Sequence, residues 1–277
     1  MLGDGVKKII FSIWSDLTTE HSSAPDWKKE SFRKFKDKLV EKQKEYAKLC
    51  NAEYFLFKAK STDYINVQFD KLLKFEELTK EYDQVVYFDL DIIPITKTNI
   101  FEQFDFDYPC VYDYDVNNNA QDEEWKKWLR WQYKQKMIID SMNRYSKVAA
   151  KNAMLLIEDV VGNDRICNTA VVCGNKNAAN LLKFSERIPD MDKTLLEAKV
   201  DSVYPREYSE GWVRNNEVYF SFILEKYNIK YNNIGIQWNY VLDSMVAEFT
   251  SGVHLIHQVN KDFEKTFTLL ESQQQPL

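Results

Sequence analysis

One short apolar run constrains the fold of this chain more than any other segment. Residues 81–96 read EYDQVVYFDLDIIPIT, and Val85 to Phe88 form a β-branched and aromatic run that is too short for an amphipathic helix. Such a run predicts a strand buried on both faces. Pro94 then denies further ladder hydrogen bonds, which predicts a strand end close before it, where open α/β sheets usually bind their ligands.

Two carboxylates stand at this predicted strand end. Asp89 and Asp91 lie two residues apart, so in an extended chain both side chains project on one side while Leu90 faces the opposite layer. Carboxylate oxygens in that arrangement suit a hard divalent cation. A solvated acidic turn after a strand is the alternative interpretation of the same residues.

Strands alternate with helices on both sides of this run, which predicts an α/β fold with a largely parallel sheet flanked by helices. We expect strands at 7–14, 53–59, 85–88, 110–112 and 166–173, with short strands at 236–240 and 253–257. Helices are expected from about 26 to 49 and at 70–82, 176–187 and 215–227, with a helical insertion around 121–160.

The chain is expected to form a single domain over residues 1–277, because no linker rich in Pro, Gly or Ser interrupts it. Within it we expect a nucleotide-binding half at about 1–115, an acceptor-side half at about 160–261 and a C-terminal tail at 262–277.

Charge and cysteine content exclude several classes of protein. The net charge of −6 argues against broad binding to nucleic acid or anionic membranes, so a phosphate ligand would need local cations or a metal. The four cysteines show neither a zinc-ligand spacing nor a disulfide framework. No apolar stretch has the length of a signal-peptide core or a membrane span, so we expect a soluble, cytoplasmic protein of undetermined oligomeric state.

Of the three histidines, His257 is the candidate metal ligand. His254 and His257 lie three apart on one predicted strand and therefore face opposite sides, so they are not expected to bind one metal together. His257 stands at the end of that strand, whereas His21 is expected at the surface.

Several segments together resemble a known family. Tyr87 to Pro94, YFDLDIIP, resembles the DxD segment of GT-A glycosyltransferases, especially glycosyltransferase family 8, the glycogenin-like group. Three further features occur in the same order as in that family. Lys71 resembles its basic residue, the segment CNTAVV at 167–172 resembles its strand with an Asn, and His257 resembles its third metal ligand.

The resemblance implies a GT-A type, Rossmann-like fold and a metal-dependent glycosyltransferase. It would move a sugar, with retention of configuration, from a nucleotide-diphosphate donor, UDP-sugar being favoured, to a glycan, protein or lipid-linked acceptor. Asp89, Asp91 and His257 would hold Mn²⁺ or Mg²⁺, and the imidazole favours Mn²⁺. The donor-binding residues that it implies are Ser12, Trp14, Lys71, Asp89, Leu90, Asp91, Asn168, Thr169 and Lys261.

The sequence departs from the family pattern in two places. The family continues after its histidine with His-x-x-Gly-x-x-Lys, whereas here Asn260 replaces the glycine and Lys261 comes two residues early. Asn216-Glu217 resembles the family's Asp-Gln pair with both residues changed. Asn216 and Glu217 are therefore the candidate catalytic residues. Glu217 would orient or deprotonate the acceptor hydroxyl or steady the donor sugar. The alternative interpretation of the pair is a helix cap with an acid in its first turn.

Other candidates have a structural interpretation beside the functional one. Lys71 and Lys74 also fit the solvated face of a helix rich in Lys and Glu, to which we assign Lys74. Asn168 interrupts an apolar strand, where an unpaired amide costs about 1–3 kcal/mol, so it must have a partner. Trp238, Asn239 and the tryptophans at 125–131 are candidates for acceptor contact, although aromatic residues at helical spacing more often form core.

Two rival functions remain open. A phosphohydrolase of the haloacid dehalogenase type would use Asp89 as nucleophile, but the later Gly-Asp-x-x-x-Asp segment that such enzymes need is missing. A glycosyltransferase-like scaffold that binds sugar or nucleotide without catalysis is the second rival.

Overall fold

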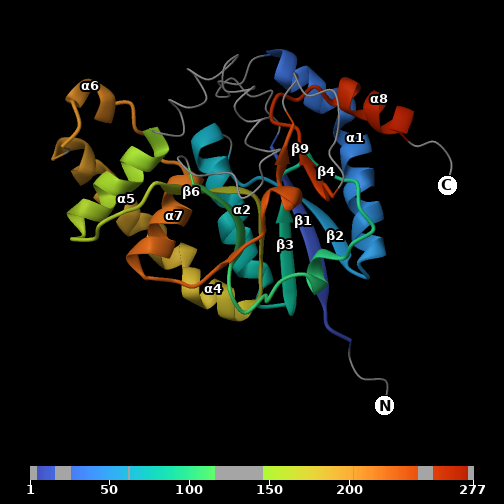
Figure 1. Ribbon diagram of the computed structural model, residues 1–277, viewed down its shortest axis with the longest axis horizontal. Coiled ribbons are helices and arrows are strands. Elements are labelled where there is room, and N and C mark those ends of the chain that lie inside the picture. Colours follow the sequence, from blue (N-terminus) through green and yellow to red (C-terminus); the bar gives the residue numbers. More distant parts are fainter. Residues whose placement is uncertain are drawn as a thin grey trace.

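The structure is a computed structural model that describes residues 5–15, 26–61, 63–115, 146–201, 203–242 and 252–273. A central sheet is covered by helices on both faces, with α1 (Asp26–Leu49) and α8 (Phe263–Gln273) on one side (Figure 1). On the other side lie α2 (Tyr64–Leu78), α4 (Lys176–Leu182), α5 (Phe184–Val200) and α7 (Asn216–Lys226). Three short helices are α6 (Arg206–Ser209), η1 (Ile100–Glu102) and η2 (Ile236–Trp238).

The main sheet has the strand order β2-β1-β3-β6-β5-β7. Its strands are β1 (Lys8–Trp14), β2 (Glu53–Lys58), β3 (Gln84–Phe88), β5 (Cys110–Asp115), β6 (Arg165–Gly174) and β7 (Asn232–Asn233). β1 pairs in parallel with β2 and β3, and β5 in parallel with β7, whereas β6 is antiparallel to both of its neighbours. The predicted α/β fold with a mostly parallel sheet is therefore confirmed.

A second, smaller sheet has the order β4-β9-β8 and carries the candidate metal ligand His257. β9 (Leu255–His257) pairs antiparallel with β4 (Ile92–Pro94) and parallel with β8 (Tyr240–Val241). The expectation that Pro94 ends ladder pairing was wrong in detail, because Pro94 lies opposite Leu255 within this sheet. Strand β3 ends earlier, where the chain turns at the acidic pair.

Alternation along the strands supplies both halves of the core. Ile9 and Phe11 of β1 point to the cluster that contains Leu72 and Phe75 of α2, whereas Ile10 points to the opposite cluster. A strand buried on both faces cannot be polar on either, which explains the continuous apolar runs in this sequence.

Two helices differ from the predicted boundaries because of local capping. The helix expected at 70–82 begins at Tyr64, since the Asp63 side chain accepts a hydrogen bond from the Asn66 backbone N–H at 2.9 Å. The helix expected at 176–187 is divided at Lys183, whose left-handed backbone (φ 47°) ends α4 before α5 begins.

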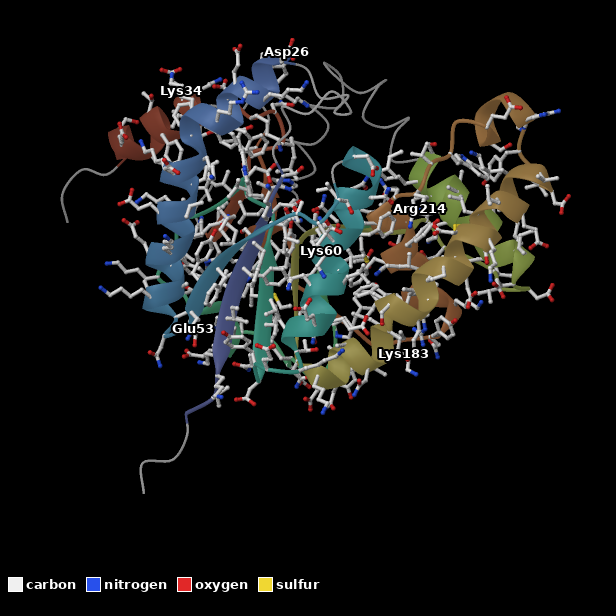
Figure 2. The ribbon with its side chains drawn as sticks, turned by 180° about the vertical axis from the view of Figure 1, so that it is seen from behind. Asp26, Lys34, Glu53, Lys60, Lys183 and Arg214 are labelled. Carbon is white, nitrogen blue, oxygen red and sulfur yellow. The ribbon has the colours of Figure 1, made fainter. Side chains whose placement is uncertain are left out.

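The C-terminal segment and the 236–240 segment also differ from expectation. Residues 263–273 form α8, and Phe263 and Phe267 are buried against α1, where they contact Phe32 and Phe35. Lys34 of α1 lies where the two helices meet (Figure 2) and pairs with a glutamate of α8. Residues 236–238 form η2 instead of a strand.

Of the helical insertion expected around 121–160, the structure describes residues 146–157 as helix. The remainder, with the tryptophans at 125–131, and His21 lie outside the described residues. None of the described helices combines the length with the apolar character that a membrane crossing requires. The division into a nucleotide-binding and an acceptor-side half stays a prediction.

Candidate active site

The acidic pair lies in a tight turn that follows β3. The Ile92 backbone N–H donates to the Asp89 carbonyl at 2.9 Å, which closes a turn across Asp89 to Ile92. The extended conformation on which the sequence argument was conditional does not occur here, because the chain must turn from the main sheet into β4. The turn nevertheless leaves both carboxylates facing one region, while Leu90 packs into the apolar cluster that contains Leu39.

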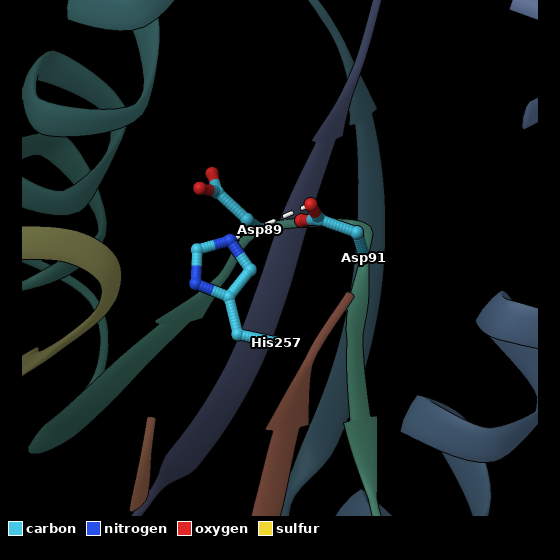
Figure 3. Close-up of side chains that lie close together, drawn as sticks. All are labelled: Asp89, Asp91 and His257. Atoms are coloured by element: carbon cyan, nitrogen blue, oxygen red, sulfur yellow. Dashed lines mark ion pairs between the residues drawn. The ribbon is translucent and has the colours of Figure 1, made fainter. Parts of the chain in front are cut away.

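Strand pairing brings a histidine to the same region. His257 at the end of β9 lies opposite Ile92 in the ladder, and one ligand atom each of Asp89, Asp91 and His257 lies within 4.8 Å of the others (Figure 3). The Asp91 and His257 side chains are buried, whereas the Asp89 side chain is 30% exposed. Two carboxylates and an imidazole with one open side fit a hard to borderline divalent cation.

His254 faces away from this group, as the strand spacing predicts. Its ring lies 4.3 Å from the ring of Trp238, and its Nδ1 lies 3.0 Å from Thr96 Oγ1. The assignment of Trp238 to the core interpretation also follows, because its side chain is 5% exposed.

A lysine and an imidazole lie beside the buried carboxylate of Asp91. Lys261 forms an ion pair with Asp91, and His257 Nε2 lies 3.5 Å from Asp91 Oδ2. Burial raises the pKa of Asp91, but the charge of the adjacent Lys261 is the largest opposing cause, and the pKa lies well below its usual range. The early lysine in this histidine segment therefore does reach the acidic pair, with the backbone of Lys261 in a left-handed conformation (φ 61°).

A second lysine binds the other carboxylate. Lys71 of α2 is 6% exposed, and its Nζ lies 3.0 Å from both Asp89 Oδ1 and the Thr169 carbonyl oxygen. The solvated-face interpretation therefore does not hold for Lys71. The Tyr87 hydroxyl donates to Asp89 as well, and burial, followed by the Asp89 charge, raises the pKa of Tyr87 well above its usual value.

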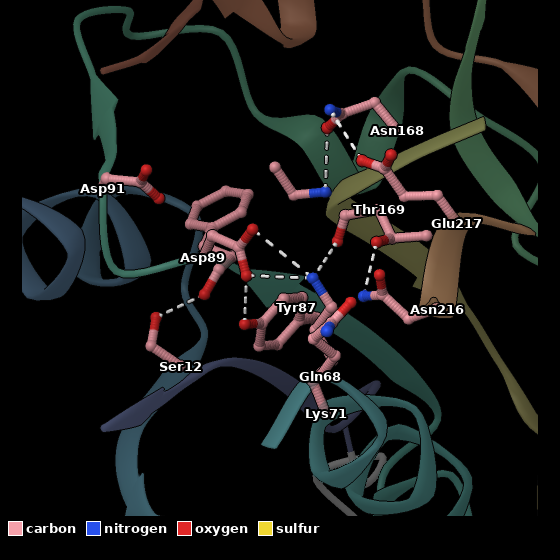
Figure 4. A network of polar contacts seen from close by, with 12 residues as sticks. Ser12, Gln68, Lys71, Tyr87, Asp89, Asp91, Asn168, Thr169, Asn216 and Glu217 are labelled. Atoms are coloured by element: carbon pink, nitrogen blue, oxygen red, sulfur yellow. Dashed lines mark hydrogen bonds and ion pairs between the residues drawn. The ribbon is translucent and has the colours of Figure 1, made fainter. Parts of the chain in front are cut away.

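The strand β6 and the start of α7 form the next part of the network (Figure 4). Asn168 Nδ2 donates to Glu217 Oε1 at 3.0 Å, and Asn216 Nδ2 donates to Thr169 Oγ1 at 2.9 Å. Asn215, not Asn216, caps α7, because its side chain accepts from the backbone N–H groups of residues 217 and 218. The cap interpretation therefore fails for Asn216, whose side chain bonds Thr169 instead, whereas Glu217 does lie in the first turn of α7, as that interpretation expects.

Glu217 remains a carboxylate in this setting. Burial raises the pKa of Glu217, but the adjacent charge of Lys147, with which it forms an ion pair, outweighs burial and lowers the pKa below its usual value. Only 12% of the Glu217 side chain is exposed, so its charge acts with little screening by solvent.

The buried side-chain amide of Gln43 stabilises the acidic turn. Gln43 of α1 donates to the carbonyl oxygens of Asp89 (3.1 Å) and Ile92 (2.9 Å). Its Oε1 lies 2.6 Å from Ser12 Oγ, which is itself 2.7 Å from the Phe88 carbonyl oxygen. Ser12 is fully buried, so it holds the backbone of the turn and is not an open contact for a ligand.

Most of the sequence-predicted site residues thus lie in one connected group. Two do not join it: Leu90 packs in the core, and Trp14 packs near Phe32 with Lys36 Nζ 4.9 Å from its ring centroid. Sequence reasoning missed Gln43, Lys147 and Tyr87. Tyr87 carried a usable signal, because it lies near the end of β3, two residues before Asp89.

Comparisons with known proteins were made for the whole chain. No protein-family model and no curated protein matches it. Among solved structures, mouse xyloside xylosyltransferase 1 in its apo form is 13% identical with a TM-score of 0.44, over 92% of this chain and 98% of that chain.

Two further solved structures have similar values. A glycosyltransferase involved in glycosylation of the major capsid of PBCV-1 is 12% identical with a TM-score of 0.44, over 95% of this chain and 99% of that chain. The galactosyltransferase LgtC, in complex with donor and acceptor sugar analogs, is 11% identical with a TM-score of 0.43, over 98% and 97%. All three are glycosyltransferases, the class that the sequence resembles, but values this low assign no activity to this chain.

Proposed function

We propose that this protein is a metal-dependent glycosyltransferase that moves a sugar from a nucleotide-diphosphate donor to a hydroxyl acceptor. The observation that carries the proposal is the convergence of Asp89, Asp91 and His257 within 4.8 Å at the end of a parallel strand. Ligand sites of open α/β sheets occupy this position in the fold. UDP as the donor nucleotide and retention of configuration come from the sequence resemblance alone.

The charges around the turn suit a diphosphate. Asp89, Asp91 and His257 would hold Mn²⁺ or Mg²⁺, which when bound neutralises the diphosphate and stabilises the leaving group as a Lewis acid. Lys71 forms an ion pair with Asp89, and Lys261 forms an ion pair with Asp91. Their ammonium groups add positive charge where the leaving nucleotide gains negative charge.

The β6 and α7 side of the group suits the sugar. Asn168 and Thr169 follow one another on β6, and the Asn168 side chain is only partly buried. Glu217 is held by Asn168 and Lys147 in a fixed position beside them. A carboxylate there would steady positive charge that develops on the sugar, or orient the acceptor hydroxyl.

Ligand-dependent thermal unfolding tests the proposal. Wild type and Asp91→Asn are each heated with a panel of nucleoside diphosphates and nucleotide sugars, with Mn²⁺ or with EDTA. A ligand at 100 times its Kd adds about 2.7 kcal/mol to the free energy of unfolding. We expect stabilisation by the ligands of one base, only with Mn²⁺ and only in wild type.

Other outcomes separate the rival functions. Stabilisation without any release of nucleoside diphosphate or transfer of sugar, over many donors and acceptors, would support the non-catalytic scaffold. Hydrolysis of an aryl phosphate that is lost in Asp89→Asn, without an effect of nucleotides, would support the phosphohydrolase.

A further inference from the structure

A chain of hydrogen bonds joins the candidate metal ligands to Glu217, and one backbone group sets its direction. The Ala170 backbone N–H lies 3.0 Å from Asn168 Oδ1 and can only donate. Asn168 therefore presents its oxygen on that side and its NH₂ group to Glu217, 3.0 Å away. The carboxylate of Glu217 can only accept, so both ends of the Asn168 amide agree with one orientation.

Asn239 continues this chain to the histidine. Its Nδ2 lies 2.7 Å from Asn168 Oδ1, an acceptor, so Asn239 donates through its NH₂ group. Its Oδ1 then faces His257 Nδ1 at 2.9 Å. An amide oxygen only accepts, so the hydrogen of the neutral His257 ring lies on Nδ1. The unprotonated nitrogen is then Nε2, the atom that faces Asp91.

We propose that Asn239 is a positioning residue that holds His257 in the tautomer required to bind a cation and fixes its ring relative to Glu217. Asn239 lies between η2 and β8 and is fully buried. Both side-chain hydrogen bonds described above go to residues of the candidate site. A ligand histidine bonded through its other nitrogen has a fixed ring orientation, and loss of such a partner weakens metal binding.

This inference rests on the proposed function only for the metal, because the tautomer can be measured without it. Long-range ¹H–¹⁵N NMR of the metal-free protein, at a pH where the ring is neutral, distinguishes the two tautomers. The chain has three histidines, and His257→Gln assigns the signal. We expect the Nδ1–H form in wild type and a shift toward Nε2–H in Asn239→Leu. An Nε2–H ring in wild type, or an unchanged ring in the variant, would overturn the inference.

Mn²⁺ affinity, measured by electron paramagnetic resonance, gives the functional test. Asn239→Leu should weaken binding about 10- to 100-fold, the usual effect of losing such a partner. Asn239→Asp keeps an acceptor for His257 Nδ1–H but loses the donor to Asn168 Oδ1, so it should bind Mn²⁺ more tightly than Asn239→Leu does. Thr194→Val is the matched control, because it removes a buried hydroxyl that bonds Glu158 and the Asp190 carbonyl in α5 and should leave affinity unchanged.

The outcomes separate this inference from the proposed function. If wild type binds Mn²⁺ and the Leu and Asp variants of Asn239 weaken alike, or neither weakens, the positioning role is overturned. If wild type itself does not bind Mn²⁺, the proposed function fails, and the tautomer measurement alone then decides the role of Asn239. Thermal unfolding of each variant confirms that it is folded.

Discussion

Replacement of Gln43 tests how the acidic turn is held in place. The Gln43 side chain is fully buried in α1. Its Nε2 donates to the carbonyl oxygens of Asp89 and Ile92, and its Oε1 accepts from the Tyr54 hydroxyl at 2.9 Å and lies close to Ser12 Oγ. Gln43→Leu keeps the approximate volume and removes all of these hydrogen bonds.

The expected loss in the free energy of unfolding depends on which hydrogen bonds remain for each former partner of Gln43. Ser12 retains the Phe88 carbonyl, and the Asp89 carbonyl still accepts the N–H that closes the turn. The Ile92 carbonyl and the Tyr54 hydroxyl each lose a hydrogen-bond partner, which costs about 1–3 kcal/mol for a buried group. Tyr54 is only partly buried and can turn toward water. We therefore expect the free energy of unfolding to fall by about 2–4 kcal/mol.

Urea denaturation measures the loss of stability, and Mn²⁺ titration of the folded variant measures the effect on the site. Gln43→Glu is the second variant, because it keeps an acceptor for Ser12 and Tyr54 but loses the NH₂ group that holds the turn. Weaker Mn²⁺ binding is expected in both variants. If Gln43→Leu unfolds within about 0.5 kcal/mol of wild type, the range of neutral surface substitutions, and binds Mn²⁺ equally well, the bracing role is refuted.

Three further predictions concern charge and burial. Lys71→Met removes a charge-assisted contact at the acidic pair, worth about 1.5–3 kcal/mol, so nucleoside-diphosphate affinity should fall about 10- to 100-fold in calorimetric titration; an unchanged Kd would contradict its role. Lys151 is fully buried in an ion pair with Glu225, so Lys151→Met should lower the free energy of unfolding by about 3–5 kcal/mol. Adding Glu225→Leu should restore most of this loss. A double variant as unstable as Lys151→Met would contradict the assignment of the loss to the unpaired charge. Burial raises the pKa of Tyr54 to about 12, and burial with a nearby carboxylate raises the pKa of Tyr87 further. An unfolded chain releases these protons near pH 10 while the folded chain keeps them, so stability should fall as pH rises above about 10, and less steeply in Tyr87→Phe; equal slopes in denaturant titrations would refute this.

Local patterns were sufficient to predict the longer strands of the main sheet and the helices α1, α2 and α7, but not the short strands β4 and β7, the length of α5, or the helices α6 and α8. Runs such as Val85 to Phe88 are apolar because both of their faces are covered, so their sequence signal is strong. The antiparallel direction of β6 had no such signal, because it depends on the path of the chain between distant segments. The division of a helix at Lys183 depends on one left-handed residue that is not a glycine, which the sequence does not announce.

The candidate site was predictable where charged residues follow strands and resemble a known motif. Asp89, Asp91 and His257 belong to that class. Gln43 and Asn239 do not, because a lone amide, whether in a charged helix as for Gln43 or named only for acceptor contact as for Asn239, gives no indication of which distant atoms it bonds. Their roles arise from packing between segments far apart in the sequence.

Release of nucleoside diphosphate from a panel of nucleotide sugars is the most direct test of metal-dependent glycosyl transfer. Wild type is measured with Mn²⁺ and with EDTA, and Asp89→Asn with Mn²⁺, each with and without a mixture of sugar acceptors. We expect release from the sugars of one base, faster with an acceptor, and lost both with EDTA and in the variant. Release that is equal in wild type and Asp89→Asn, or that is insensitive to EDTA, would contradict the assignment.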